Sequence, residues 1–190
     1  MKPAYADLLS VLCVIVFGIF LAPLARSTTL ARLFLAQLTS AATAVVDVQC
    51  TGSQTLWRGG EIWSVTPFRV LENWKGTSPR DIQVWMIGGS VGPVTSYVPG
   101  APRFRAGENA ILFLEPTRTG VLSITGWGEG TFRIRRDART GEMRVTQDTG
   151  ATPGFDPSAR AFRATGIRNW PLAKLKARVI AAETSERRTP

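Results

Sequence analysis

A succession of short, turn-bounded runs of β-forming residues fills the sequence between residues 42 and 147. Valine, isoleucine, threonine and aromatic residues dominate these runs, and glycine, proline or asparagine separates them at intervals of about ten residues. The expected strands are 42–50, 61–74, 81–87, 94–98 and 110–116. This pattern predicts a mainly β protein, built as a small antiparallel barrel or sandwich.

Two details of the strand pattern carry expectations of their own. Pro67 lies inside 61–74, and proline has no N–H to donate to a ladder, so we expect an edge strand or a bulge there. The stretch TGSQTLWRGG, residues 51–60, is rich in glycine and polar residues. We therefore expect it to be a loop.

The clearest hairpin is TFRIRRDARTGEMRVTQ, residues 131–147. Apolar residues alternate with arginines on both arms, and Gly141 lies in the loop, where a left-handed conformation is expected. Because the apolar residues must face the core, Arg133, Arg135 and Arg144 are expected on the opposite face. That face is either a solvated basic surface or a docking patch for an anionic partner such as a phospholipid surface. These three arginines are the candidate binding residues.

Amphipathic segments flank the β region on both sides. LARLFLAQL, residues 30–38, places leucine and phenylalanine at helical spacing, after two threonines that can cap a helix. A C-terminal helix is expected to begin near Asn169 and Pro171. The sequence thus predicts a single domain over residues 28–182 and a frayed tail over 183–190.

The segment from Leu8 to Ala25 is the most hydrophobic part of the chain. Its basic start, apolar run and small residues before Ser27 fit a secretory signal peptide over residues 1–27. The alternative is an N-terminal membrane anchor, in which residues 8–25 associate with the membrane. Both alternatives predict an extracytoplasmic location for the rest of the chain, either periplasmic or secreted.

Ser90 lies in the sequence GGSVG, which fits the G-x-S-x-G pattern of serine hydrolases. That nucleophile needs a histidine base and a helix directly after the serine. The chain contains no histidine, and Gly92-Pro93 predicts a loop at this point. Ser90 is therefore expected to be structural, and a secreted serine hydrolase remains the alternative function.

Cys50 is the single cysteine of the expected exported part, since Cys13 lies in the apolar N-terminal run. The apolar flank of Cys50 predicts a buried, free thiol that reacts slowly. One thiol without histidine does not supply the ligands of a soft-metal site. We therefore expect neither a metal nor a cofactor.

Five segments follow one another in an order that resembles a group of exported bacterial proteins without an assigned activity. These segments are AVVDVQC, TPFRVLENWKG, GGSVG, VPGAPRFRAGENAILFLEP and GWGEGTFRI, and the resemblance covers roughly residues 28–134. The Val-Leu-x-x-Trp-Lys-Gly turn and the Gly-Glu-x-x-x-Leu-Phe strand are also similar to netrin-like domains, the OB-type barrels of tissue inhibitors of metalloproteinases. The resemblance implies an OB-like, netrin-like barrel with a short N-terminal helix and a C-terminal helix. Those inhibitors act through an N-terminal cysteine held by disulfides, so their mechanism does not carry over to Cys50.

The same resemblance implies a set of framework positions rather than a site. Its glycines permit backbone conformations closed to other residues, and its apolar members would fill the barrel. Its one acidic member, Glu108, would accept backbone N–H bonds from the GGSVG loop or, alternatively, contact a ligand or a metal. The positions are Gly88, Gly89, Gly92, Phe104, Gly107, Glu108, Phe113 and Leu114.

These observations favour an exported, non-enzymatic binding module on an OB-like barrel. A formal net charge of +9 suits a partner that is an acidic protein or an anionic envelope surface. A nucleic-acid-binding OB domain is a further hypothesis, because aromatics such as Trp57 and Trp127 would suit base stacking. The export signal argues against it, since nucleic acid is scarce outside the cytoplasm.

Overall fold

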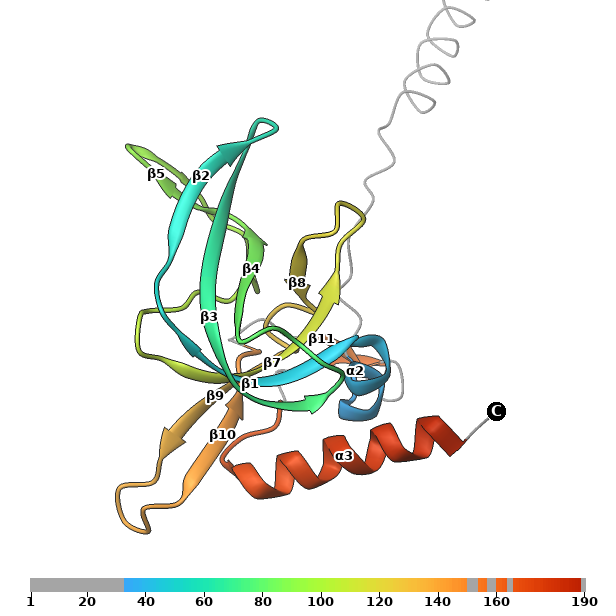
Figure 1. The fold of residues 1–190 in the computed structure, drawn as a ribbon. Helices are drawn as coiled ribbons and strands as arrows, with labels where there is room; N and C mark the ends of the chain where they lie inside the picture. The colour runs from blue at the N-terminus through green and yellow to red at the C-terminus, as the bar shows by residue number, and fades with distance from the viewer. Residues whose placement is uncertain (1–32, 150–153, 157–159, 164–165, 189–190) are drawn as a thin grey trace, which may run out of the picture.

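The structure is a computed structural model that describes residues 33–149, 154–156, 160–163 and 166–188. The signal or anchor segment 1–27 and the two threonines expected to cap the first helix lie outside the described residues. Within the described ranges, no helix combines the length and the apolar character that crossing a bilayer requires. The fold is mainly β with two flanking helices, as the sequence pattern predicted (Figure 1).

One large sheet and two small hairpins make up the β structure. The large sheet contains β1 (Ala44–Cys50), β2 (Gln54–Arg58), β3 (Glu61–Lys75), β4 (Asp81–Ile87), β7 (Asn109–Pro116), β8 (Leu122–Ile124), β9 (Thr131–Arg136), β10 (Met143–Gln147) and β13 (Trp170–Pro171). The small hairpins pair β5 (Gly89–Val91) with β6 (Val94–Ser96), and β11 (Gly154–Asp156) with β12 (Ala161–Arg163). The described residues also contain the helices α2 (Leu35–Ala41) and α3 (Leu172–Arg188).

β1 pairs with two strands at once, and this double pairing closes the sheet into a barrel. One edge of β1 is antiparallel to β3 and the other is antiparallel to β7. The order around the barrel is β1, β3, β4, β8, β7 and back to β1. β4 and β8 are parallel, with Val84 opposite Leu122, so the expected all-antiparallel barrel is wrong in this pairing. A closed ring with an odd number of strands cannot alternate in direction throughout, which makes one parallel pair unavoidable.

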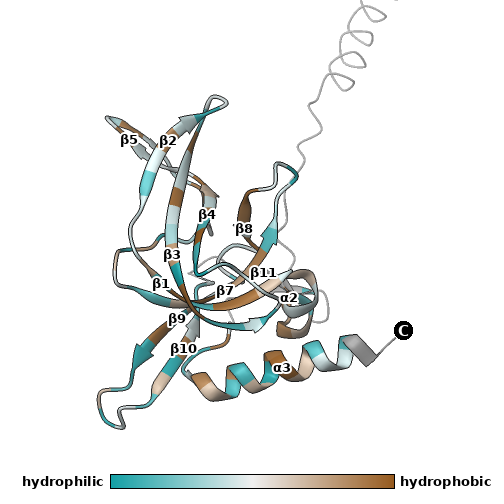
Figure 2. Cartoon of the chain, viewed as in Figure 1, coloured by the Kyte–Doolittle hydropathy of each residue, from teal (hydrophilic) through white to brown (hydrophobic). Residues whose placement is uncertain are grey.

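Side chains of the barrel wall alternate between two separate cores. In β1, Val48 points into the barrel, whereas Val45 points outward. The outer core lies between the barrel wall, the β9–β10 hairpin and the two helices, and it includes Leu38 of α2 with Leu175 and Val179 of α3. Figure 2 shows the apolar bands of α3 recurring between hydrophilic ones along the helix. The barrel thus buries apolar residues on its inner face and on the part of its outer face that the helices cover.

Phe113 and Leu114 are neighbours in β7 but belong to different cores. Leu114 lies in the inner core together with Phe104, as expected. Phe113 lies in the outer core, where its ring centroid is 5.6 Å from that of Phe132. The expectation that Phe113 fills the barrel is therefore wrong, because successive residues of a strand point to opposite faces.

β2 occupies much of the stretch 51–60 that was expected to be a loop, and it pairs with the first part of β3. The β2–β3 pairing ends at Gln54 and Val65, and the β1–β3 pairing begins at Cys50 and Phe68. Pro67 lies at this changeover, in a strand that has partners on both sides rather than at a sheet edge. Its carbonyl accepts a hydrogen bond of 2.9 Å from the Thr51 N–H. Pro67 therefore lies at a position where neither β1 nor β2 requires a backbone N–H donor from β3.

The helix ends differ in part from those expected. α2 begins at Leu35, where the Phe34 N–H donates to Gln37 Oε1 over 2.9 Å. α3 begins directly after Pro171, as predicted, but it continues to Arg188. Residues 183–188, which were expected in a frayed tail, are therefore helical.

Cys50 lies in the inner core with a side chain that is 1% exposed, in agreement with the predicted buried free thiol. Its Sγ donates to the Gly52 carbonyl over 3.1 Å. Burial raises the pKa of the Cys50 thiol above its usual value. The neutral form is thereby favoured, and slow reaction with thiol reagents remains a prediction.

The turn after β3 provides a test of how tightly the barrel closes. Gly76 has a φ of +68°, and a Cβ atom there would lie 2.5 Å from the backbone carbonyl oxygen of Thr43. We expect Gly76→Ala to lower the free energy of unfolding by about 2–3 kcal/mol, because a clash with backbone adds to left-handed strain. Urea denaturation of the purified chain measures the change.

The matched control is Gly120→Ala. Gly120 has a φ of +79°, but a Cβ atom there would meet nothing within 4 Å. Gly120→Ala should lower the free energy of unfolding by about 1 kcal/mol, because only the left-handed backbone conformation disfavours alanine there. Equal losses in the two variants would show that the Thr43 carbonyl can move away from residue 76, and would contradict the tight closure.

Candidate functional site

Arg133 is the centre of a polar cluster beside the barrel. Its guanidinium donates to Asp148 Oδ2 over 2.6 and 2.9 Å and to Glu108 Oε2 over 2.8 Å. It also donates to the Arg103 carbonyl over 2.7 Å. Its Cζ lies 4.2 Å from the centroid of the Phe104 ring, a cation–π distance. The donor groups of Arg133 are therefore used inside the protein.

Through Phe104, Arg133 fixes the loop that packs on the inner core. Phe104 is 7% exposed and meets Phe68 edge to face, with 4.9 Å between ring centroids. Next to it, the Gly107 N–H donates to the Cys50 carbonyl and the Cys50 N–H donates to the Glu108 carbonyl, both over 2.8 Å. The Phe-x-x-Gly-Glu motif thus fastens this loop to the end of β1. The Glu108 carboxylate binds Arg133, which corrects the expectation that it binds the backbone of the GGSVG loop.

The other two candidate arginines differ in their surroundings. Arg135 and Arg144 are directly opposite each other across the β9–β10 hairpin. Arg144 makes ion pairs of 2.9 Å with Glu142 and 3.5 Å with Asp137, and it donates to the Asn169 carbonyl over 2.9 Å. Arg135 is exposed and has no ion pair with a carboxylate of the described residues. The three arginines do share one face of the hairpin, but two of them are already paired.

Ser90 lies in an exposed hairpin rather than on a nucleophile elbow. It is opposite Thr95 in the β5–β6 pairing, and the two hydroxyl oxygens are 2.8 Å apart. The turn at Gly92-Pro93 leads into β6, so a strand follows the serine where an elbow requires a helix. The expected short strand at 94–98 is present as Val94–Ser96. Ser90 is thus in a setting that differs from that of an activated serine.

The framework glycines lie at positions of positive φ. The glycines concerned are Gly88, Gly89, Gly92 and Gly107. Gly89 shows why a side chain is excluded, since a Cβ atom there would lie 2.6 Å from Thr55 Cγ2 and 2.8 Å from Ser64 Oγ. The Thr55 hydroxyl also donates to the Ser90 carbonyl. Gly89 therefore lets the β5–β6 hairpin pack closely on β2 and β3, whereas a Cβ atom at Gly92 or Gly107 would meet nothing within 4 Å.

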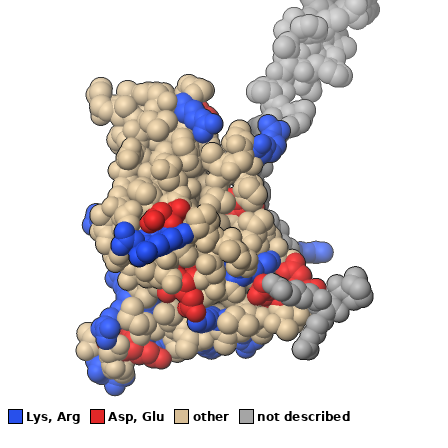
Figure 3. Space-filling view, viewed as in Figure 1, with Lys and Arg blue, Asp and Glu red and all other residues tan. Residues whose placement is uncertain are grey.

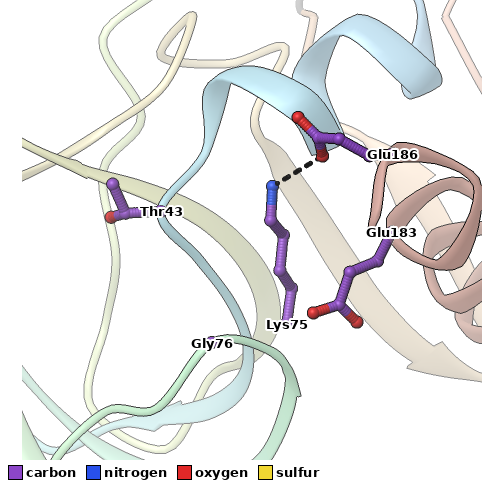
Figure 4. A pocket seen from close by; sticks show the side chains of 5 residues that line it. All are labelled: Thr43, Lys75, Gly76, Glu183 and Glu186. Atoms are coloured by element: carbon purple, nitrogen blue, oxygen red, sulfur yellow. Dashed lines mark hydrogen bonds and ion pairs between the residues drawn. The ribbon is translucent and has the colours of Figure 1, made fainter. Parts of the chain in front are cut away.

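Lys75 joins both helices to the barrel (Figure 4). Its Nζ donates to the Thr39 carbonyl in α2 over 2.6 Å and forms an ion pair of 3.3 Å with Glu186 in α3. A hydrogen bond from Ser40 and the ion pair with Lys75 lower the pKa of Glu186. A hollow of about 460 Å³ is lined here by Thr43, Lys75, Gly76, Glu183 and Glu186. Both helices bind Lys75, so this hollow lies at the junction between the helices and the barrel.

Asp47 is an acidic residue in the barrel wall, next to α3. It lies opposite Glu72 in the β1–β3 pairing, and its Oδ1 is buried without a hydrogen-bond partner among the described residues. Burial and then the charge of Glu72 raise the pKa of Asp47 to about 6, while Lys176 lowers it. Glu72 accepts hydrogen bonds from Lys176 Nζ over 2.5 Å and Trp74 Nε1 over 3.0 Å, and both lower its pKa. Asp47 was not among the residues predicted from the sequence, although it is the one charged residue within the otherwise largely apolar AVVDVQC.

A second hollow, of about 490 Å³, lies between the tip of the β2–β3 hairpin and the β7–β8 turn. We call it the aromatic hollow, and it is lined by Arg58, Gly59, Glu61, Trp63, Thr117, Arg118, Thr119 and Val121. The Arg58 Cζ lies 4.8 Å from the ring centroid of Trp85, which is 6.5 Å from that of Trp63. Figure 3 shows a notch in the upper part of this face, with basic side chains on both sides of it. The hollow is therefore lined by one tryptophan, Trp63, and by an arginine that stacks on the neighbouring Trp85.

Large apolar side chains are exposed on β2 and on the β5–β6 hairpin that packs against it. Trp57 of β2 is 51% exposed, Val94 of β6 is 45% exposed, and Tyr97 just after β6 is 76% exposed. Trp127, in contrast, packs against the inner core. Of the two tryptophans considered for base stacking, Trp57 is therefore the accessible one.

The comparisons with known proteins leave the chain without an assigned family. No family model matches the sequence, and no curated protein matches it. In the part of the chain that the structure describes, no group of three or more His, Cys, Asp or Glu side chains is arranged to hold a metal ion. Function must therefore be inferred from the surfaces of this chain alone.

The Arg133 cluster yields a prediction that separates its three candidate arginines. We expect Arg133→Gln to lower the free energy of unfolding by about 2–3 kcal/mol, because it leaves two carboxylates close together and removes the cation over Phe104. Arg135→Gln is the matched control on the same strand and face, and its effect should stay within about 0.5 kcal/mol. Guanidinium denaturation of both variants provides the values. An Arg133→Gln variant as stable as the parent chain would contradict the inference that Arg133 holds the Phe104 loop in place.

Asp47 yields a prediction about pH. Its folded-state pKa is raised to about 6 from an ordinary 3.8, so the folded state holds its proton more tightly and stability falls as pH rises through 6. We expect Asp47→Asn to be more stable than the parent at pH 8 by on the order of 1–2 kcal/mol, allowing for partial exposure of the side chain. At pH 4 the difference should nearly vanish.

The measurement is thermal denaturation of the Asp47→Asn variant and the parent chain at several pH values. The control is Asp81→Asn, because Asp81 is 72% exposed and its only described ion pair, with Arg69, is long at 3.8 Å. This control should show no pH-dependent gain. A constant difference between the parent and Asp47→Asn from pH 4 to 8 would mean that Asp47 does not titrate in this range.

Proposed function

We propose that this chain is an exported, non-enzymatic binding module on an OB-type barrel, and that it binds a protein partner through the end that carries the aromatic hollow. The observation that carries the proposal is a pair of exposed aromatic side chains, Trp57 of β2 and Tyr97 just after β6. The stacked Arg58 follows Trp57 in β2 and lies on the other face of the β2–β3 arm. Tryptophan, tyrosine and arginine are the residues most enriched among those that dominate the binding energy of protein interfaces.

The fold supports the choice of this end. A closed five-stranded barrel whose ligands bind at loops between strands is the arrangement of OB-type domains. Here the β2–β3 hairpin and the β7–β8 turn border the aromatic hollow, away from the helices that cover the outer core (Figure 1). The netrin-like resemblance in the turn after β3 and in β7 agrees with this assignment.

The chemistry of the surface supports binding rather than catalysis. Ser90 is the one candidate nucleophile that a sequence motif suggests. Its hydroxyl forms a hydrogen bond with the Thr95 hydroxyl, and the sequence contains no histidine to act as its base. Arg58 and Arg118 border the aromatic hollow without an ion pair to any described carboxylate. A partner that places an acidic side chain between them would find two accessible guanidinium groups.

Site-specific photocrosslinking in the native cells tests the proposal. A photoreactive amino acid replaces Trp57 or Tyr97 in the full chain, and Leu71, which is 54% exposed in β3, serves as the matched control position. We expect one discrete protein adduct shared by positions 57 and 97 and absent at 71. With the partner in hand, Trp57→Ala should weaken binding by roughly 30-fold, since interface tryptophans contribute about 2 kcal/mol or more.

The outcomes that overturn the proposal are distinct. Adducts that contain nucleic acid would favour the nucleic-acid-binding alternative. Ester hydrolysis by the parent chain that disappears in Ser90→Ala would favour the hydrolase. Equal adducts at all three positions, or none at 57 and 97, would mean that this end of the barrel is not a protein-binding surface.

A further inference from the structure

The β9–β10 hairpin, the segment just before β13 and the first two turns of α3 carry an excess of accessible positive charge. We propose that this basic end docks on an anionic lipid surface. Its members are the exposed residues Arg135, Arg136, Arg139, Arg168, Lys174 and Arg178. The proposal is independent of the protein-binding function, because none of these six residues lines the aromatic hollow.

Nearby carboxylates offset the charge of the basic end only in part, because other cations engage them. Asp137 and Glu142 pair with Arg144. Likewise, Glu108 and Asp148 pair with Arg133.

The same holds for the one acidic residue that α3 engages near its start. Glu72 pairs with Lys176. None of the six members of the basic end forms an ion pair with a described carboxylate. Together with Arg133, Arg144 and Lys176, the six members make nine basic residues against five carboxylates. The region therefore keeps a net charge of +4, which attracts anions.

The elements that carry these residues are neighbours in space. Arg135 and Arg136 are in β9, directly paired with β10, and β10 pairs in turn with Trp170 and Pro171 of β13. α3 starts at the next residue, and Lys174 Nζ lies 4.2 Å from the centroid of the Trp170 ring. Figure 1 shows the hairpin projecting from the body beside the start of α3, and Figure 3 shows basic side chains at the end of this projection.

The shape of the basic end favours an extended anionic surface over a small ligand. Its charges are spread over a projecting hairpin and the start of a helix, and neither of the two hollows described above includes any of them. A membrane rich in anionic lipid attracts each such residue over a distance of about one Debye length. Of the three arginines that the sequence analysis placed in a docking patch, Arg135 alone belongs to this surface, because Arg133 and Arg144 are paired internally.

Co-sedimentation of the full chain with vesicles tests the proposal. One set of vesicles contains phosphatidylcholine alone, and the other contains phosphatidylserine in addition. Because the apolar segment 8–25 is common to all variants, the measured quantity is the ratio of binding to anionic over neutral vesicles. We expect this ratio to fall at least tenfold in the variant Arg135→Gln/Arg136→Gln/Arg139→Gln, given roughly fivefold for each basic residue near the surface.

The matched control removes the same charge from other places. Arg69→Gln/Arg80→Gln/Arg105→Gln changes three exposed arginines that lie outside both the basic end and the aromatic hollow, and it should keep the parent ratio. Equal loss in both triple variants would show that net charge, and not this surface, drives binding, and would overturn the proposal. A parent ratio near one would also overturn it, as would strong binding to soluble heparin or to an acidic peptide without any preference for anionic vesicles.

Discussion

The rest of the structure depends on the position of β1 between β3 and β7. A strand with hydrogen-bonded partners on both sides turns an open sheet into a barrel, and closure removes the exposed edges that would otherwise pair with other chains. Closure also creates two different environments for neighbouring residues, because the inner face of the wall encloses one core and the outer face requires a cover. The two helices and the β9–β10 hairpin provide that cover over β1 and β7.

Two polar side chains, those of Arg133 and Lys75, attach a loop, the β9–β10 hairpin and the two helices to this barrel. Arg133 ties the loop around Phe104 to the hairpin, and Lys75 ties α2 and α3 to the end of β3. Both residues are partly buried, and both satisfy backbone carbonyls as well as carboxylates. This explains why segments such as Phe-x-x-Gly-Glu and Trp-Lys-Gly stood out in the sequence as motifs although they form no reactive site. Their role is to connect barrel, loop and helices.

The sequence predicted those features that depend on local alternation. β3, β4 and the hairpin with its left-handed Gly141 follow from the pattern of apolar and polar residues, and they are present. β2 was missed because glycine, serine and arginine obscure the alternation within 51–60. The parallel β4–β8 pair follows from barrel closure, which no local window contains.

The candidate site shows the same limit of sequence reasoning. Alternation placed Arg133 and Arg135 correctly on one face, but it could not show that Glu108 and Asp148 approach Arg133 from other parts of the chain. The aromatic hollow escaped notice for a similar reason, since its two borders are more than 50 residues apart in the sequence. Phe113 was assigned to the barrel interior because a strand that is apolar on both faces does not reveal which face the helices cover.

Pro67 has a consequence for how the molecule opens. On one edge of β3 the partner changes from β2 to β1 at this residue, whereas on the other edge the pairing with β4 continues past it. β2 pairs with β3 alone, and a peripheral strand with one partner can unfold locally while the remainder stays intact. The arm that carries Trp57 and Arg58 can therefore fray and re-form without loss of barrel closure. That gives the exposed end a freedom to adapt its shape to a partner that the helix-covered side of the barrel does not have.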